Sequence, residues 1–169
     1  LACYAYDCYV DIVTTRLSVP SGNNVQNPSS FSIDGYHITY NGCSSATTAT
    51  NNGNKFDQVA NFWSALGNNI TTRGFVAGYA INKYGFISQS TTTFSNGQDA
   101  GIIHERFDYY TNTCSSRANL TVVKNMGCGF SLFGFGYTAG CYNTPSSASH
   151  ERYDNICDYH TIQADLCNH

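Results

Sequence analysis

The sequence predicts a mainly β protein of the α+β type: an antiparallel sheet or sandwich with one short helix, stabilised by disulfide bonds. Three observations lead to this prediction. Short runs rich in β-branched and aromatic residues recur along the chain, separated by Gly, Asn, Ser and Pro. One segment has the apolar spacing of a helix. Eight cysteines are present without metal-binding spacing, which favours disulfides.

The first half of the chain contains two predicted strand regions. Residues 9–15 are β-branched and aromatic, and the loop that begins at Pro20 ends this run. A second strand is expected over residues 31–40, interrupted by Gly35. Residues 44–54 are rich in Ser, Thr, Asn and Ala without apolar periodicity, so they predict a surface loop or linker.

A helix is predicted directly after this loop. Apolar residues recur at three- and four-residue spacing, so they would share one helix face: Phe56, Val59, Ala60, Trp63 and Leu66. Asn54 is suited to the N-cap and Gly67 to the left-handed stop. Asp57 would lie near the positive end of the helix dipole. We expect the Trp63 face to be buried against a β-sheet.

The second half returns to strands. Two of them, at residues 75–81 and 86–94, would flank a hairpin turn at residues 82–85. Further strands are predicted over residues 102–110, 120–126 and 130–137. In the last of these, aromatics alternate with Gly134 and Gly136, which suits close approach by another backbone. Residues 153–167 fit either a strand or a helix.

The length favours a single domain. We therefore expect one disulfide-rich domain over residues 1–169. The alternative is a subdivision near residue 96, into residues 1–95 and 96–169.

The cysteines carry the argument for an extracellular protein. None of them forms a CxxC pair or stands beside a correctly spaced His, so four disulfides in an oxidising compartment are expected. They are Cys3, Cys8, Cys43, Cys114, Cys128, Cys141, Cys157 and Cys167. The sequence begins at Leu1 rather than Met, as it would after removal of a signal peptide. Glycosylation sequons at Asn69 and Asn119 agree with a secreted glycoprotein.

Composition and charge exclude several kinds of partner. Charged residues make up 11% of the chain and the net charge is −3, so no basic stripe exists for nucleic acid. Nucleic acid is expected as a partner only if the protein is a nuclease. No apolar run is long enough to span a membrane. The five His residues have no metal-ligand spacing, and no cofactor or metal is expected.

A five-residue segment occurs twice in the sequence. His104-Glu105-Arg106-Phe107-Asp108 is followed 46 residues later by His150-Glu151-Arg152-Tyr153-Asp154. As an active site, the pair could cleave a phosphodiester by general acid–base catalysis with Arg stabilising the charge. The candidate catalytic residues would be His104, Arg106, His150, Glu151 and Arg152.

The alternative interpretation of this repeat is structural, and it is the one we predict. In a chain with so few charges, Arg106 and Arg152 would be bonded to carboxylates of the two copies. The candidate carboxylates are Glu105, Asp108, Glu151 and Asp154.

Taken together, the cysteine count, the low Lys content and the Ser/Thr/Asn/Gly-rich β character resemble the small cysteine-rich effectors and toxins secreted by plant-associated fungi. The resemblance implies a secreted protein, delivered into host apoplast or cytoplasm, that acts by binding a host component without catalysis, and it implies no site residue. We expect the partner to be a host protein or glycan and the chain to be a monomer. A small ribonuclease-like hydrolase using the two His-Glu-Arg segments is the alternative. The 13 tyrosines make a lectin a further, weaker alternative.

Overall fold

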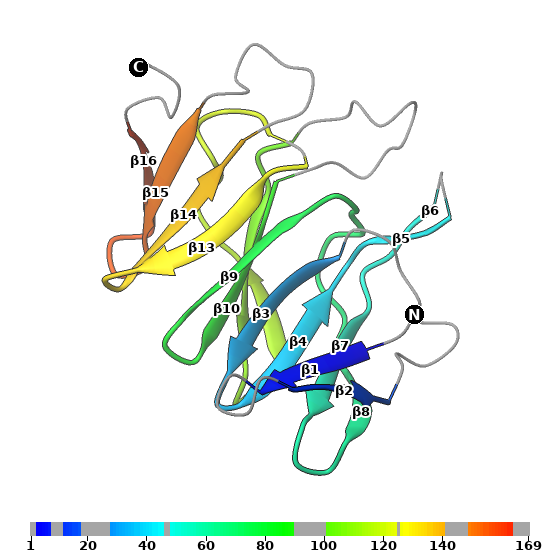
Figure 1. Ribbon diagram of the computed structural model, residues 1–169. Coiled ribbons are helices and arrows are strands. Elements are labelled where there is room, and N and C mark those ends of the chain that lie inside the picture. The colour runs from blue at the N-terminus through cyan, green and yellow to red at the C-terminus, as the bar shows by residue number, and fades with distance from the viewer. Residues whose placement is uncertain are drawn as a thin grey trace.

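The computed structural model describes residues 3–7, 12–17, 28–45, 48–89, 101–124, 126–140 and 149–163. Within these ranges the chain forms strands, turns and bends. The strands build three four-stranded antiparallel sheets and two smaller two-stranded ones (Figure 1). The prediction of a mainly β, antiparallel protein is therefore confirmed. No helix of the described residues has the length and apolarity needed to cross a membrane.

The strands of each four-stranded sheet pair in chain order, with two short strands intervening between the second and third strands of the first sheet. The first sheet contains β3 (Ser29–Ile33), β4 (Tyr36–Tyr40), β7 (Gly53–Asp57) and β8 (Phe62–Leu66). The second contains β9 (Ala77–Ile81), β10 (Tyr84–Ser88), β11 (His104–Asp108) and β12 (Thr113–Ser116). The third contains β13 (Cys128–Leu132), β14 (Phe135–Ala139), β15 (His150–Asp154) and β16 (Tyr159–Gln163). The small sheets are β1 (Cys3–Asp7) with β2 (Ile12–Arg16), and β5 (Cys43–Ser45) with β6 (Thr48–Ala49).

The three large sheets are copies of one repeat. In each, a two-residue turn joins the first two strands and a four-residue loop joins the last two. The cross-strand registers coincide as well: Phe56 faces Trp63, Phe107 faces Cys114, and Tyr153 faces His160. The repeated His-Glu-Arg segment is thus the third strand of a longer repeat, and Gly53–Asp57 is its third copy. The hairpin β1–β2 has the register of the second hairpin of this repeat.

An aspartate at the end of each third strand specifies the loop that follows. The carboxylate of Asp57 accepts the N–H groups of the residues two and three positions ahead, and Asp108 and Asp154 do the same. The last loop residue then has a positive φ, which Asn and Asp tolerate better than most residues. These residues are Asn61 (52°), Asn112 (54°) and Asp158 (52°).

This loop explains why the predicted helix is wrong. Asp57 forms the turn between β7 and β8 instead of occupying a first helical turn, and the positive φ of Asn61 interrupts any helix there. Val59 lies at the tip of the loop and is exposed. Trp63 is buried as predicted, but as the cross-strand neighbour of Phe56 at 5.1 Å between ring centroids. Its Nε1 donates to the carbonyl oxygen of Leu17.

The sheets pack face to face in chain order, with β9 in contact with both β3 and β13 (Figure 1). An aromatic side chain of one sheet lies on a glycine of the next: Phe31 on Gly85, and Tyr79 on Gly136. A Cβ built on either glycine would lie 2.0 Å from a ring atom, so both positions require glycine. The arrangement resembles consecutive blades of a β-propeller.

Several predicted boundaries change as a result. Residues 130–137 are not one strand but the hairpin β13–β14, which turns at Phe133 and Gly134. Residues 82–83, rather than 82–85, form the turn between β9 and β10. Residues 120–126 form no strand among those described, apart from an isolated bridge between Lys124 and Gly101. Residues 153–167 contain the end of β15 and all of β16, and the proposed division near residue 96 lies outside the described residues.

Disulfide stabilisation is not found in the described part of the chain. Cys43, Cys114, Cys128 and Cys157 carry free thiols. Cys114 faces Phe107 at the position that Trp63 and His160 occupy in the other sheets, so it serves as a packing residue. The side chain of Cys3 and the residues Cys8, Cys141 and Cys167 lie outside the described part.

Candidate functional site

The two His-Glu-Arg segments lie at equivalent places in neighbouring sheets, as strands β11 and β15. Because side chains alternate along a strand, the Glu of each segment points to one face while the His and Arg point to the other. Both Glu side chains are buried. Their surroundings decide whether the segments form an active site or a structural network.

Glu105 is held by a buried arginine, Arg73, that lies outside the five-residue His-Glu-Arg segment. The carboxylate of Glu105 lies 2.7 Å from Nη2 of Arg73 and accepts the hydroxyl of Thr71 at 2.6 Å. Arg73 also donates to the main-chain carbonyls of Gln89, Ile103 and Ile87. The exposed fractions of the Arg73 and Glu105 side chains are 0% and 1%, so a substrate has no access to this pair.

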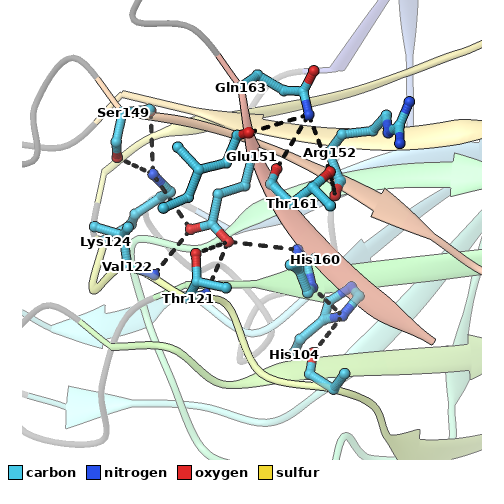
Figure 2. Close-up of polar contacts among 12 residues, drawn as sticks. His104, Thr121, Val122, Lys124, Ser149, Glu151, Arg152, His160, Thr161 and Gln163 are labelled. Atoms are coloured by element: carbon cyan, nitrogen blue, oxygen red, sulfur yellow. Dashed lines mark hydrogen bonds and ion pairs between the residues drawn. The ribbon is translucent and has the colours of Figure 1, made fainter.

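Glu151 has the equivalent partners one repeat later (Figure 2). Its carboxylate lies 3.7 Å from Nζ of Lys124 and accepts the N–H and the hydroxyl of Thr121 at 2.8 and 2.9 Å. The N–H of Val122 donates a further bond at 3.1 Å. Lys124 in turn donates to the carbonyl and the hydroxyl oxygen of Ser149. A buried carboxylate is acceptable only with such a full set of donors.

The two cations have the same structural task. Each stands in an isolated bridge shortly before the first strand of a sheet, Arg73 with Thr50 and Lys124 with Gly101. Each then bonds to the carbonyl that precedes the third strand of that sheet. A buried ion pair therefore fastens each connection to the sheet that follows it.

The two glycosylation sequons contribute hydrogen bonds to the same buried glutamates. Thr71 and Thr121, which complete them, donate their hydroxyls to Glu105 and Glu151. The side-chain nitrogen of Asn69, the atom that would carry a glycan, is buried and donates to Asn41 Oδ1 at 2.7 Å. The sequon at Asn69 is thus a structural element of the folded protein, whereas Asn119 is exposed.

The arginines of the segments are not bonded to the predicted carboxylates. Arg106 lies over the ring of Tyr84, 4.3 Å from its centroid, and Arg152 lies over Phe135 at 4.6 Å. Lys55 has the same position over Tyr36 in the first sheet, at 4.5 Å. The prediction of Arg–carboxylate pairs is wrong for two reasons. Glu105 and Glu151 point to the opposite face, and Asp108 and Asp154 accept the N–H groups of the loops that follow them. An aromatic ring on the adjacent strand is within reach of each arginine instead.

His104 lies in a buried chain of polar groups between the second and third sheets. Its Nε2 is 2.9 Å from the hydroxyl of Tyr79. Its Nδ1 is 3.1 Å from Nε2 of His160 (Figure 2). Nδ1 of His160 is 3.9 Å from Glu151. Burial lowers the pKa of His104 well below its ordinary value, and the neighbouring His160 lowers it further. Burial also lowers the pKa of His160, although Glu151 opposes this shift.

The five candidate catalytic residues do not meet in one open cleft. His104 and Glu151 are buried, and Arg106 lies on a ring of its own sheet. His150 stacks against Tyr137 on the face of β15 opposite to Glu151. The described residues contain no group of three or more His, Cys, Asp or Glu suited to a metal ion. A cavity of about 380 Å³ where the first strands begin is lined by Pro28, Phe75, Val76, Met126 and Gly127, none of which is titratable.

An open aromatic surface is the feature that sequence reasoning missed. Phe130, Tyr137 and His150 lie side by side across β13, β14 and β15, with centroid distances of 5.0 and 5.5 Å between neighbours. We call these three residues the ladder. Tyr79, Phe86 and His104 form the same ladder in the second sheet, at 5.2 and 5.4 Å, and there the third sheet covers it.

One signal in the sequence could have led to the ladder. The Asp of each third strand is followed, four residues later, by Asn or Asp, at positions 61, 112 and 158. Aligning the chain on these pairs brings Gly53–Asp57 into line with the two His-Glu-Arg segments. It shares the Asp with both of them and Phe56 only with the first, where Phe107 is the equivalent. The three sheets and their equivalent positions would then follow.

The comparisons with known proteins give no family. No family model matches the sequence, and no curated protein matches it.

Proposed function

We propose that the protein is a secreted, non-catalytic binding protein of the effector or toxin type, which acts on a host component through the open face of the third sheet. The observation that carries this proposal is the ladder of Phe130, Tyr137 and His150. The same ring arrangement is a packing interface in the second sheet. Exposed apolar surface of this kind marks interaction sites in soluble proteins.

The use of the ionisable residues supports binding rather than catalysis. A general acid or base has to reach the proton that it transfers. Glu105 and Glu151 are instead saturated by Arg73, Lys124 and main-chain donors. No described observation favours the ribonuclease-like alternative over binding.

The extracellular location is part of the proposal and has its support in composition. Polarity comes mainly from Asn, Ser, Thr and Tyr, with charged residues at 11%. The disulfide argument is weaker than the sequence suggests, because the four described cysteines are free.

The proposal is tested by a host response and a cleavage assay on the same preparations. The purified chain is infiltrated into plant leaf tissue, and a Phe130→Ser/Leu132→Ser variant is compared with it. The matched control is Val59→Ser/Ile156→Ser, which removes two apolar side chains from exposed loops outside the open face of the third sheet. We expect the response to be lost with the first variant and kept with the control.

The same proteins are incubated with RNA and with glycans. We expect no turnover. If the parent cleaves either substrate, and His104→Ala or His150→Ala abolishes cleavage at unchanged melting temperature, the protein is a hydrolase and the proposal is wrong. If the Phe130→Ser/Leu132→Ser variant gives an unchanged response, the open face of the third sheet is not the binding surface.

A further inference from the structure

The interface between consecutive sheets is built twice in the same way. Phe31 and Ile33 of β3 pack on the second sheet, where Gly85 receives the ring of Phe31. Tyr79 and Ile81 of β9 pack on the third sheet, where Gly136 receives the ring of Tyr79. Repeat proteins bury such faces by stacking each unit on its neighbour.

The third sheet presents the same face, and no other sheet among the described residues lies against it. Its equivalent residues are Phe130 and Leu132, with exposed fractions of 44% and 48%. Phe31 and Tyr79 are 7% and 2% exposed. Gly129 is turned toward Gly78 and Tyr79 of the second sheet, so Phe130, one residue on, faces the opposite way. Figure 1 shows the third sheet at one end of the stack, with β9 and β10 on its other side.

The internal interfaces define what would fit this face. An occupant needs a flat antiparallel surface with a glycine where the ring of Phe130 rests, as Gly85 and Gly136 provide inside the chain. In the second sheet, an aromatic ring also stands edge-on to the ladder: Tyr153 lies 4.3 Å from His104 at an angle of 83°. Edge-on packing of this kind is favourable for aromatic pairs.

A second copy of the chain does not meet this requirement. Gly85 and Gly136 are already covered by Phe31 and Tyr79. The equivalent position in the first sheet is His37, the second residue of β4, whose imidazole would occupy the place of the incoming ring. The neighbouring positions of β3 on that face are the exposed polar residues Ser30 and Ser32. The described faces of this chain therefore contain no free acceptor for Phe130.

We infer that the open face of the third sheet docks a partner protein through a β-hairpin with the pattern of this repeat: alternating apolar residues and a glycine opposite Phe130. The inference rests on the proposed binding function and specifies the chemistry of its partner. Contact is sheet against sheet through side chains, so a free strand edge is not needed.

The probe is a hairpin that the chain itself uses. A backbone-cyclised peptide of residues 127–140, with Cys128→Ser, contains Gly136 in its natural hairpin context. Cyclisation is needed because an isolated two-stranded hairpin is marginally stable. The peptide is titrated into the full chain in a calorimeter. The matched control peptide carries Gly136→Val, which fills the space for the ring. The matched protein variant is Phe130→Ser/Leu132→Ser.

We expect the parent protein to bind the glycine peptide saturably. The affinity should be at least about tenfold lower for the valine peptide, and also for the protein variant with the glycine peptide, because a few central residues dominate such interfaces. Sedimentation of the free parent should show a monomer. Absence of binding, equal binding of both peptides, or a parent dimer abolished by the Phe130→Ser/Leu132→Ser change would overturn the inference. If the peptide fails while the leaf response still depends on Phe130 and Leu132, the inference falls and the proposed binding function stands.

Discussion

Arg73 and Glu105 form an ion pair of 2.7 Å with both side chains buried, and Lys124 and Glu151 hold the equivalent places one repeat later at 3.7 Å. Neither cation belongs to the repeated five-residue segment. Each comes from the connection that leads into the sheet, so the pair joins residues 32 and 27 positions apart, respectively. Glu105 and Glu151 therefore have a structural role, since each holds the preceding connection against its sheet.

Removing one partner of this pair should be strongly destabilising. Arg73→Met leaves the buried carboxylate of Glu105 without its cation, and we expect the free energy of unfolding to fall by about 3–5 kcal/mol. Urea unfolding measures this. The double variant Arg73→Met/Glu105→Leu should recover much of the loss, because no uncompensated charge remains. A double variant as unstable as the single one would show that the charge pairing is not the cause.

Arg106 should contribute through its ring contact. Its guanidinium carbon lies 4.3 Å from the centroid of Tyr84, and the side chain is partly exposed. Tyr84→Leu should therefore lower stability by about 0.5–1 kcal/mol beyond the loss in an Arg106→Ala background. A double-mutant cycle measured by thermal unfolding gives this coupling directly. Coupling of Arg106 to Asp108 instead would restore the Arg–carboxylate interpretation.

Trp63 should be a major core residue of the first sheet. Its side chain packs on Phe56, and its exposed fraction is 4%. Trp63→Ala should cost about 3–5 kcal/mol as a large-to-small change. The fluorescence maximum of the native protein should lie well to the blue of free tryptophan. A maximum near that of tryptophan in water would contradict the burial of this side chain.

Stability should fall as the pH drops below about 6.5. Burial holds the pKa of His104 well below its ordinary value of 6.5, and also lowers the pKa of His160. Below that value the unfolded chain binds protons that the folded chain does not, so unfolding becomes easier until the lower folded pKa is reached. Melting temperatures from pH 7.5 to 5.5 measure the effect.

The matched variants for this pH series are His104→Phe and His150→Phe. The first should flatten the pH profile, whatever its effect on absolute stability. The second changes a partly exposed His of the open face and serves as the comparison. If both variants keep the parental slope, His104 does not cause the pH dependence.

The four described thiols should differ in reactivity. Cys128 and Cys157 are exposed, whereas Cys43 is buried and Cys114 half-buried. Burial raises the pKa of Cys114 to about 12, so little thiolate forms at pH 8. Brief alkylation of the native protein followed by peptide mass analysis should label Cys128 and Cys157 first. Absence of label at both, with label appearing only after reduction, would show that they are oxidised.

Local sequence patterns determined the strand content of this protein. β-branched and aromatic runs, Asp-Gly and Phe-Gly turns, and the Asp at the end of each third strand act over a few residues. The spacing of Phe56 and Trp63 led to the wrong helix prediction, because a separation of seven residues fits two helical turns as well as a hairpin with a four-residue loop. The positive φ of Asn61 decides between them, and one segment read alone does not reveal it.

The partners of the charged residues were decided only by the tertiary structure. The sequence showed two His-Glu-Arg segments, but Arg73 and Lys124 reach their glutamates because the connection before each sheet folds back onto that sheet. The exposure of Phe130 has the same origin, since its equivalents Phe31 and Tyr79 are apolar aromatics too. Local patterns specify the repeat, which is the same in all three sheets. Burial depends on whether another sheet lies above, and that is a property of the stack rather than of the repeat.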